Sequence, residues 1–213
     1  MTQLLLQYTF EEGRVENPDG TLEGQLVGGA FEAVGVDVPG WGPVSSAVRF
    51  EEGTLLLAPV PPGLAQAGAF TVEVVVHLDR APASAMSLLA ALEPPLSLTL
   101  EPAPGGVRAV AAVMSMNGWC VCASEPGAAS GWRAFGISFT GRELVLLENG
   151  RVAARLAVGA RLAGAERPGP LFVGTPSESG IGPLRGSLGG VRAWEGIPEA
   201  SGLLEAAAHG WDA

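Results

Sequence analysis

Three oxygen-bearing residues gather in the segment ENPDG, where they could bind a metal ion. Glu16, Asn17 and Asp19 offer carboxylate and amide oxygens, the hard ligands that calcium prefers. Pro-Asp-Gly is equally typical of an ordinary tight turn, in which the Asp side chain accepts backbone hydrogen bonds. No second cluster of carboxylates accompanies the segment. The sequence therefore leaves two interpretations, a calcium site or a turn, and indicates no other cofactor.

Two of the five tryptophans stand where an indole ring could meet a ligand. Trp41 lies between glycines and prolines in VPGWGPV, which predicts a loop, and Trp119 begins a strand-like run just after an Asn-Gly turn. An exposed indole ring can stack on the apolar face of a sugar. We therefore take Trp41 and Trp119 as candidate ligand-binding residues. The alternative is that each ring packs against its own loop.

The titratable residues form no catalytic pattern. Glycoside hydrolysis needs two carboxyl groups that face one cleft, as alternate residues of a strand would provide. Glu11-Glu12 and Glu51-Glu52 are adjacent, so on a strand they would face opposite ways. His77 lies in the apolar run VVVHLD, where covering one face of a strand is a simpler role than that of a base. The sequence has no serine elbow and no phosphate loop, and we expect no enzyme activity.

The charge balance restricts the class of partner. The chain has 213 residues, with 22 acidic and 12 basic residues, and every basic residue is arginine. A net charge of −10 repels the phosphate backbone, so we expect no nucleic-acid partner. The same charge argues against a polybasic membrane anchor. A content of 47% hydrophobic residues is enough for a real core without metal or disulfide.

The N-terminus and the two cysteines indicate in which cellular compartment the chain is expected. MTQLLLQYTF has no charged leader and only a short apolar run, so it predicts a strand and not a signal peptide. No apolar run reaches the length of a membrane span. We therefore expect a chain that is cytoplasmic as synthesised, or built into a larger particle. Cys120 and Cys122 share one face of a strand, and we expect two reduced, packed thiols.

The pattern along the chain predicts one all-β domain over residues 1–213. Short apolar runs alternate with turn residues, which is typical of a sandwich of about a dozen strands. FTVEVVVHL is nearly all apolar and predicts a central strand covered on both faces. ELVLLENGRVAARL predicts a hairpin with a type I′ turn at Asn149-Gly150. The Pro-rich EPPLSLTLEPAPGG predicts a guarded edge strand, and EASGLLEAAAHGW predicts a short C-terminal helix.

Several motifs in a fixed order resemble laminin-G-like domains of the concanavalin A type. GWRAFGISFTGRELVLLENGRVAARL, GPLFVGTP and LRGSLGGVRAWEGIPEASGLLEAAAHGW are similar to the last strands of that family. LLLQYTFEEG, NPDGTLEGQL, SSAVRFEEGTLLLAPV and FTVEVVVHL are similar to its first strands. The resemblance spans about Leu4 to Trp211. It implies a two-sheet antiparallel jelly-roll sandwich with a C-terminal helix.

Two departures from the family pattern affect the expected sites. In the family that the sequence resembles, many members carry an Asp-rich segment before the DGTL turn and an Asp-Tyr pair after the F-x-G motif. Here these positions read RVENPDGTL and RFEEGTLLLAP, so the carboxylates have moved to Glu51 and Glu52.

Two functions agree with this sequence. The first is a non-catalytic, lectin-like module that binds a glycan or a glycosylated or protein surface, which is what the resemblance implies. The second is a structural or protein-interaction subunit of a larger assembly, such as a phage capsid decoration or tail protein. The first hypothesis predicts that Trp41 or Trp119 is exposed beside polar side chains.

Overall fold

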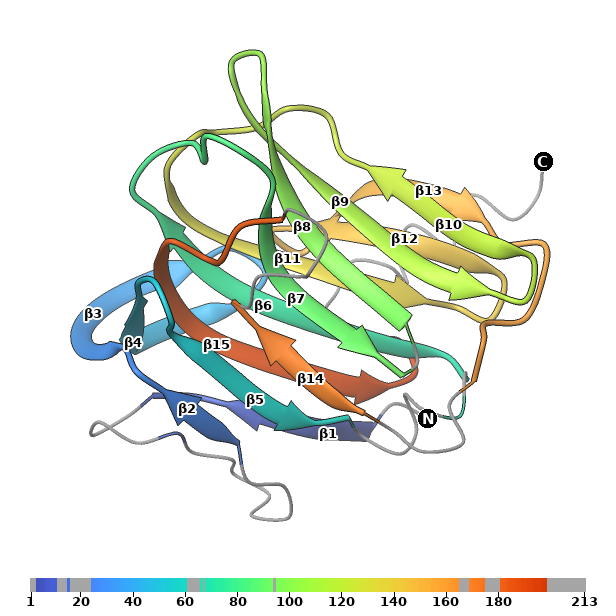
Figure 1. Ribbon diagram of the computed structural model, residues 1–213, viewed down its shortest axis with the longest axis horizontal. Helices are drawn as coiled ribbons and strands as arrows, with labels where there is room; N and C mark the ends of the chain where they lie inside the picture. Colours follow the sequence, from blue (N-terminus) through green and yellow to red (C-terminus); the bar gives the residue numbers. More distant parts are fainter. Residues whose placement is uncertain are drawn as a thin grey trace.

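The computed structural model describes residues 3–10, 15, 24–60, 66, 68–93, 95–164, 169–174 and 181–198. These residues form two antiparallel β-sheets that pack face to face, and they contain no helix (Figure 1). The predicted all-β, two-sheet sandwich is therefore confirmed. The predicted C-terminal helix, at 199–211, and the ENPDG segment lie outside the described residues.

The first sheet has the strand order β13-β12-β11-β6-β15-β4-β3, and β1 pairs with the second half of β15. Its strands are β1 (Gln3–Tyr8), β3 (Ala30–Val38), β4 (Gly42–Phe50), β6 (Phe70–Leu78), β11 (Gly131–Phe139), β12 (Glu143–Glu148), β13 (Arg151–Ala157) and β15 (Gly186–Glu195).

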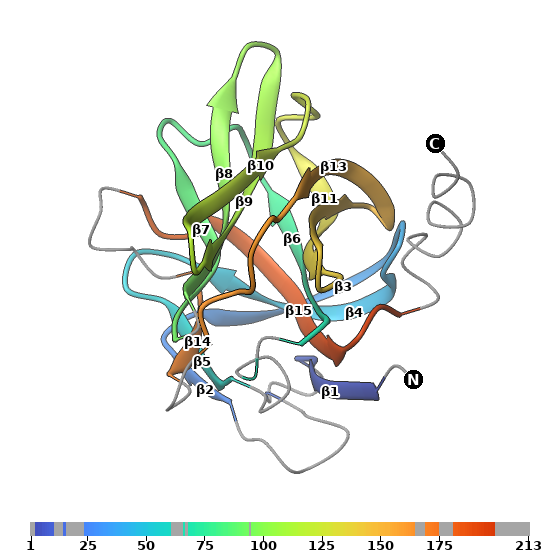
Figure 2. The ribbon, with the colours of Figure 1, turned by 90° about the vertical axis from the view of Figure 1, so that its right-hand side faces the viewer.

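The second sheet has the strand order β10-β9-β8-β7-β14-β5-β2. Its strands are β2 (Gln25–Val27), β5 (Leu55–Pro59), β7 (Met86–Leu92), β8 (Pro95–Ala103), β9 (Gly106–Ser115), β10 (Gly118–Ala123) and β14 (Pro170–Val173). Figure 2 shows the two layers from the side, with the β8–β9 hairpin reaching beyond the body of the sandwich.

The core lies between the two inner faces. Because side chains alternate along a strand, every second residue of each strand points inward. Along β6 these are Val72, Val74 and Val76, which are fully buried in one continuous cluster with side chains of the opposite sheet such as Leu88 and Leu98. This cluster joins both sheets into one packed unit.

The outer face of β6 is also covered, which explains why the strand is apolar at nearly every position. Val75 packs with Val38, Val44 and Ala134 in a second, smaller cluster. Val38 ends β3 and Val44 lies in β4, so the end of the β3–β4 hairpin lies over the outer face of the sheet. The prediction of a central strand buried on both faces is confirmed.

The β12–β13 hairpin has the predicted turn. Asn149 and Gly150 have φ angles of 50° and 72°, the positive values that a type I′ turn requires. The Asn149 amide oxygen accepts a hydrogen bond from the Ala134 backbone N–H at 3.0 Å, which ties the turn to β11. The turn also touches the β3–β4 hairpin, because a Cβ on Gly40 would lie 2.1 Å from the Gly150 nitrogen.

One strand lies elsewhere than the sequence predicts. The Pro-rich segment around LSLTL was expected at a sheet edge, but β8 lies between β7 and β9 and that prediction is wrong. Its prolines stand near the two ends of the strand, at Pro95 and Pro102. The apolar centre keeps its N–H groups for the ladders on both sides, so terminal prolines do not exclude a central position.

Candidate binding site

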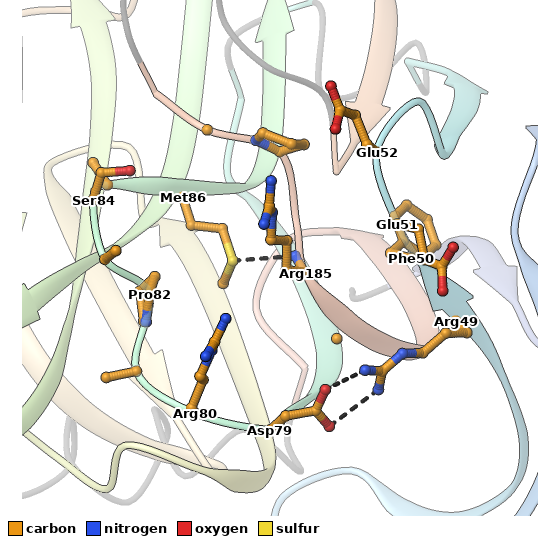
Figure 3. A pocket seen from close by; sticks show the side chains of 16 residues that line it. Arg49, Phe50, Glu51, Glu52, Asp79, Arg80, Pro82, Ser84, Met86 and Arg185 are labelled. Atoms are coloured by element: carbon orange, nitrogen blue, oxygen red, sulfur yellow. Dashed lines mark hydrogen bonds and ion pairs between the residues drawn. The ribbon is translucent and has the colours of Figure 1, made fainter.

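A pocket of about 750 Å³ lies at one rim of the sandwich (Figure 3). It is bounded by the turn after β4, the connection from β6 to β7 and the segment that leads into β15. We call it the rim pocket, and its lining residues are 49–52, 79–86, 182, 183, 185 and 186. Its volume falls in the range of about 300–1,000 Å³ that is typical of ligand sites.

Backbone hydrogen bonds fix two walls of the rim pocket to each other. Gly182 pairs with the start of β7: its N–H donates to the Ala85 carbonyl at 2.7 Å, and its carbonyl accepts from the Ser87 N–H at 2.9 Å. Three residues later, the Arg185 N–H lies 3.3 Å from the Met86 sulfur, which accepts its hydrogen bond. The backbone that carries Arg185 is therefore held in place before any ligand arrives.

A two-pronged ion pair supports the base of the rim pocket. The Arg49 guanidinium donates to both carboxylate oxygens of Asp79, at 3.0 Å for the Nη1–Oδ1 pair. The hydrogen bond from Arg49 lowers the pKa of Asp79, and His77 adds a smaller effect in the same direction. Asp79 is thus an ionised anchor and is not suited to act as a proton donor near neutral pH.

Two arginines on the wall of the rim pocket have no charged partner among the described residues. Arg80 and Arg185 are both exposed, and neither side chain makes an ion pair or a hydrogen bond with any described residue. Figure 3 shows both guanidinium groups on the Met86 side of the pocket, while Glu51 and Glu52 stand on the opposite side. Neither glutamate forms an ion pair within the described part of the chain. The pocket therefore has a cationic side and an anionic side.

Sequence reasoning did not identify the two arginines. Arg80 follows β6 and Arg185 precedes β15, two strands that are distant in the sequence but adjacent in the sheet. No local motif marks either residue, because their relationship arises from the pairing of β6 with β15. The shifted carboxylates Glu51 and Glu52 were the only part of this pocket that the sequence brought to attention.

Trp41 lines a different, smaller pocket of about 390 Å³ on the outer face of the first sheet. Its ring is half-buried, and the Arg192 guanidinium lies 3.8 Å from the ring centroid. Arg192 also lies 5.1 Å from the centroid of the Trp194 ring. One face of the Trp41 indole is therefore occupied by a side chain of the protein itself, and a role in ligand binding stays a prediction.

Arg192 joins Trp41 to a buried carboxylate. Its Nη2 lies 3.1 Å from Oε2 of Glu73, and its Nη1 and Nη2 donate to the carbonyls of Trp41 and Gly40 at 3.2 and 3.3 Å. Burial raises the pKa of Glu73 and lowers the pKa of Arg192, while their mutual attraction acts against both shifts. These contacts attach the turn of the β3–β4 hairpin to β6 and β15 at the centre of the first sheet.

Trp119 lies on the second sheet and is 55% exposed. It stands in β10, an end strand of the sheet order, opposite Met114 of β9. Met116 and Val121 are also exposed, at 72% and 50%. We call Met114, Met116, Trp119 and Val121 the apolar strip. Trp41 and Trp119 therefore lie on different sheets and do not form one site, and binding by Trp119 stays a prediction.

The predicted calcium segment lies outside the described residues, whereas the two cysteines lie within them. Glu16, Asn17 and Asp19 lie outside the described residues, so calcium binding there stays a prediction. Within the described part of the chain, no group of three or more His, Cys, Asp or Glu side chains is placed to hold a metal ion. Cys120 and Cys122 are both free thiols, half-buried and buried, as expected.

Among the residues that the structure places, no helix is long and apolar enough to cross a membrane.

No protein-family model matches the sequence, and no curated protein matches it. Solved structures do match the fold. The binding domain of botulinum neurotoxin DC in complex with SialylT is 7% identical with a TM-score of 0.68, over 95% of this chain and 50% of that chain. The same domain in complex with rat synaptotagmin II is 8% identical with a TM-score of 0.68, over 97% and 52%.

A third match covers both chains almost completely. Domain 4 of AbnA, a GH43 extracellular arabinanase from Geobacillus stearothermophilus, in complex with arabinotriose, is 14% identical with a TM-score of 0.68, over 96% of this chain and 98% of that chain. The chain spans about half the length of the neurotoxin chains that it matches. At these identities the likeness shows the fold alone, a β-sandwich like those of the matched domains. The finer resemblance to laminin-G-like domains stays a prediction.

Proposed function

We propose that the protein is a non-catalytic recognition module that binds a glycan in the rim pocket. The observation that carries this proposal is a pocket of about 750 Å³ with a fixed backbone and four charged side chains, Glu51, Glu52, Arg80 and Arg185, that make no ion pair within the described residues. Sugars present many hydroxyl groups, each a donor and an acceptor, and unpaired charged groups bind such groups well.

The structural neighbours support this proposal. Domain 4 of the arabinanase was solved with arabinotriose, and the neurotoxin binding domain with SialylT. A second observation supports a module without catalysis. Glu73, whose pKa is raised, is engaged with Arg192 on another face, and Asp79 in the rim pocket has a lowered pKa. The group suited to give a proton and the larger pocket are therefore in different places.

A glycan array probed with the purified chain tests the proposal, with a variant that blocks the pocket. Ala83→Trp places a large ring in the rim pocket at an exposed position, and Ala157→Trp makes the same change on the exposed side of β13. We expect selective binding by the wild type and by Ala157→Trp, with loss of at least about tenfold in Ala83→Trp. Equal binding by both variants, or no binding to any glycan, would contradict the proposal.

The apolar strip favours a second candidate function, self-association into an assembly. β10 is an end strand in the sheet order, and exposed apolar side chains on such a strand are an interaction hazard unless a partner covers them. Light scattering tests this candidate. A stable oligomer that dissociates in Trp119→Arg, and not in the pocket variant Ala83→Trp, would support an assembly subunit. A wild-type monomer at high concentration would exclude it.

A further inference from the structure

The rim pocket has features that select the charge of its ligand. We propose that it recognises a sugar unit that carries a carboxylate, with Arg80 and Arg185 binding the carboxylate and Glu51 and Glu52 accepting hydrogen bonds from sugar hydroxyls. This inference rests on the proposed function, because it names the chemical class of glycan that the same pocket takes.

The cationic side of the rim pocket matches the chemistry of a carboxylate. A guanidinium group presents several N–H donors in a plane and matches the two oxygens of a carboxylate. Arg80 and Arg185 point to the same side of the pocket (Figure 3), and no described carboxylate pairs with either of them. Arg49, Arg108, Arg133 and Arg192 are each paired with an acidic residue, whereas Arg142, Arg151, Arg155 and Arg161 form no ion pair with a described residue but lie outside the rim pocket. The rim pocket therefore brings together two arginines that no described acidic residue neutralises.

The Arg185 backbone is hydrogen-bonded and the residue before Arg80 is ion-paired, so less order must be created on binding. The Arg185 N–H is bonded to Met86, and Asp79, which directly precedes Arg80, is clamped by Arg49. A site that is ordered in advance loses less conformational entropy when its ligand binds. Only the two side chains must then become ordered around the carboxylate.

The anionic side of the rim pocket disfavours a ligand that carries negative charge along its whole length. Glu51 and Glu52 would repel a ligand that is negatively charged along its whole length. The net charge of −10 adds to this repulsion at long range. A sugar with one carboxylate avoids the conflict, because its anionic end faces the arginines and its hydroxyls donate to the glutamates. Uronic acids and sialic acids both have this chemistry.

The test compares acidic probes with neutral counterparts by isothermal titration calorimetry on the full chain. The probes are galacturonic acid with its methyl ester and sialyllactose with lactose, so that each acidic probe carries one carboxylate and the two sources of carboxylate are separated. We expect the wild type to prefer at least one acidic probe over its neutral counterpart by about tenfold or more. Arg80→Gln/Arg185→Gln should abolish that preference, because it weakens binding of the acidic probe much more than binding of the neutral probe.

Two further double variants separate the position of the arginines from their charge and shape. Arg142→Gln/Arg151→Gln removes the same charge from two exposed arginines outside the pocket, and should retain the preference. Arg80→Lys/Arg185→Lys keeps the charge without the planar donors, and should fall between wild type and the glutamine variant. A preference that survives in the glutamine variant, or equal binding of neutral and acidic probes, overturns the inference but not the proposed function. Binding of no glycan at all overturns both.

Discussion

Glu73 and Arg192 form a buried ion pair between β6 and β15, with Nη2 and Oε2 at 3.1 Å and the Trp41 ring stacked on the guanidinium. The side chains are only 6% and 18% exposed. Because Arg192 also donates to the carbonyls of Gly40 and Trp41, this one residue connects the centre of the sheet to the end of the β3–β4 hairpin.

The two partners of this ion pair should be strongly coupled in their effect on stability, because removing one leaves the other charge buried. Glu73→Ala leaves the Arg192 charge buried and unpaired, and we expect a loss of about 3 kcal/mol or more in the free energy of unfolding. Glu73→Leu/Arg192→Leu should be less destabilised than the sum of its single variants. Urea unfolding measures each value. Glu195→Ala, an exposed glutamate on β15, is the control and should stay within about 0.5 kcal/mol of wild type.

Glu73 should also make stability depend on pH. Burial raises its pKa in the folded state, so the folded chain holds this proton more tightly than the unfolded chain. The stabilisation that comes from this bound proton is complete below a pH of about 4.3, the pKa of Glu73 in the unfolded chain. It is lost as pH rises through the higher pKa of Glu73 in the folded chain. We therefore expect the stability of wild type relative to Glu73→Gln to fall over that window, as read from urea midpoints. A difference that rises with pH would show that the sign is wrong.

The contact between two hairpin turns should make Gly40 hard to replace. Gly40 and Gly35 both have positive φ, 75° and 83°, so an alanine at either one carries left-handed strain of about 1–2 kcal/mol. A Cβ at Gly40 would lie 2.1 Å from the Gly150 nitrogen, whereas one at Gly35 meets nothing within 4 Å. Gly40→Ala should therefore be more destabilised than Gly35→Ala in thermal unfolding. Equal losses would mean that the two turns separate at little cost.

Cys122 should report the opening of the sandwich. Burial raises the pKa of its thiol to about 11, so the reactive thiolate is scarce near pH 8 in the folded chain. In a Cys120→Ser variant, iodoacetamide should label Cys122 at least about 100-fold more slowly in buffer than in denaturant, where an ordinary thiol has a pKa near 8.5. Mass spectrometry follows the rate. Comparable rates in the two solutions would place the thiol in contact with solvent.

The local features of the fold were predictable from the sequence, and the long-range ones were not. The turn at Asn149-Gly150 follows from two residues that tolerate positive φ, and the apolar run of β6 predicts burial on both faces. The interior position of β8 was missed because the prolines beside it resemble the guards of an edge strand. The sequence pattern does not predict which strands pair with each other.

The candidate site was harder to predict for the same reason. Arg80 and Arg185 meet at one pocket only because β6 pairs with β15, and the partner of Glu73 likewise comes from β15. Trp119 is exposed as its position after a turn suggested, whereas the ring of Trp41 is covered by Arg192 in spite of the glycines beside it. A loop sequence predicts an exposed backbone, but it does not show which distant side chain lies over a ring.

The contact between Gly40 and Gly150 joins two points more than half of the chain apart, so it bears on how the protein folds. Closing so long a loop costs entropy that is recovered only when the intervening strands have paired. Trp41 lies next to this contact and loses solvent when the contact forms. We therefore expect Trp41 to be among the last groups to reach its final environment, as a late fluorescence phase in refolding that Trp41→Phe removes. The two hairpin turns would then act as a latch that closes after the sheet is complete.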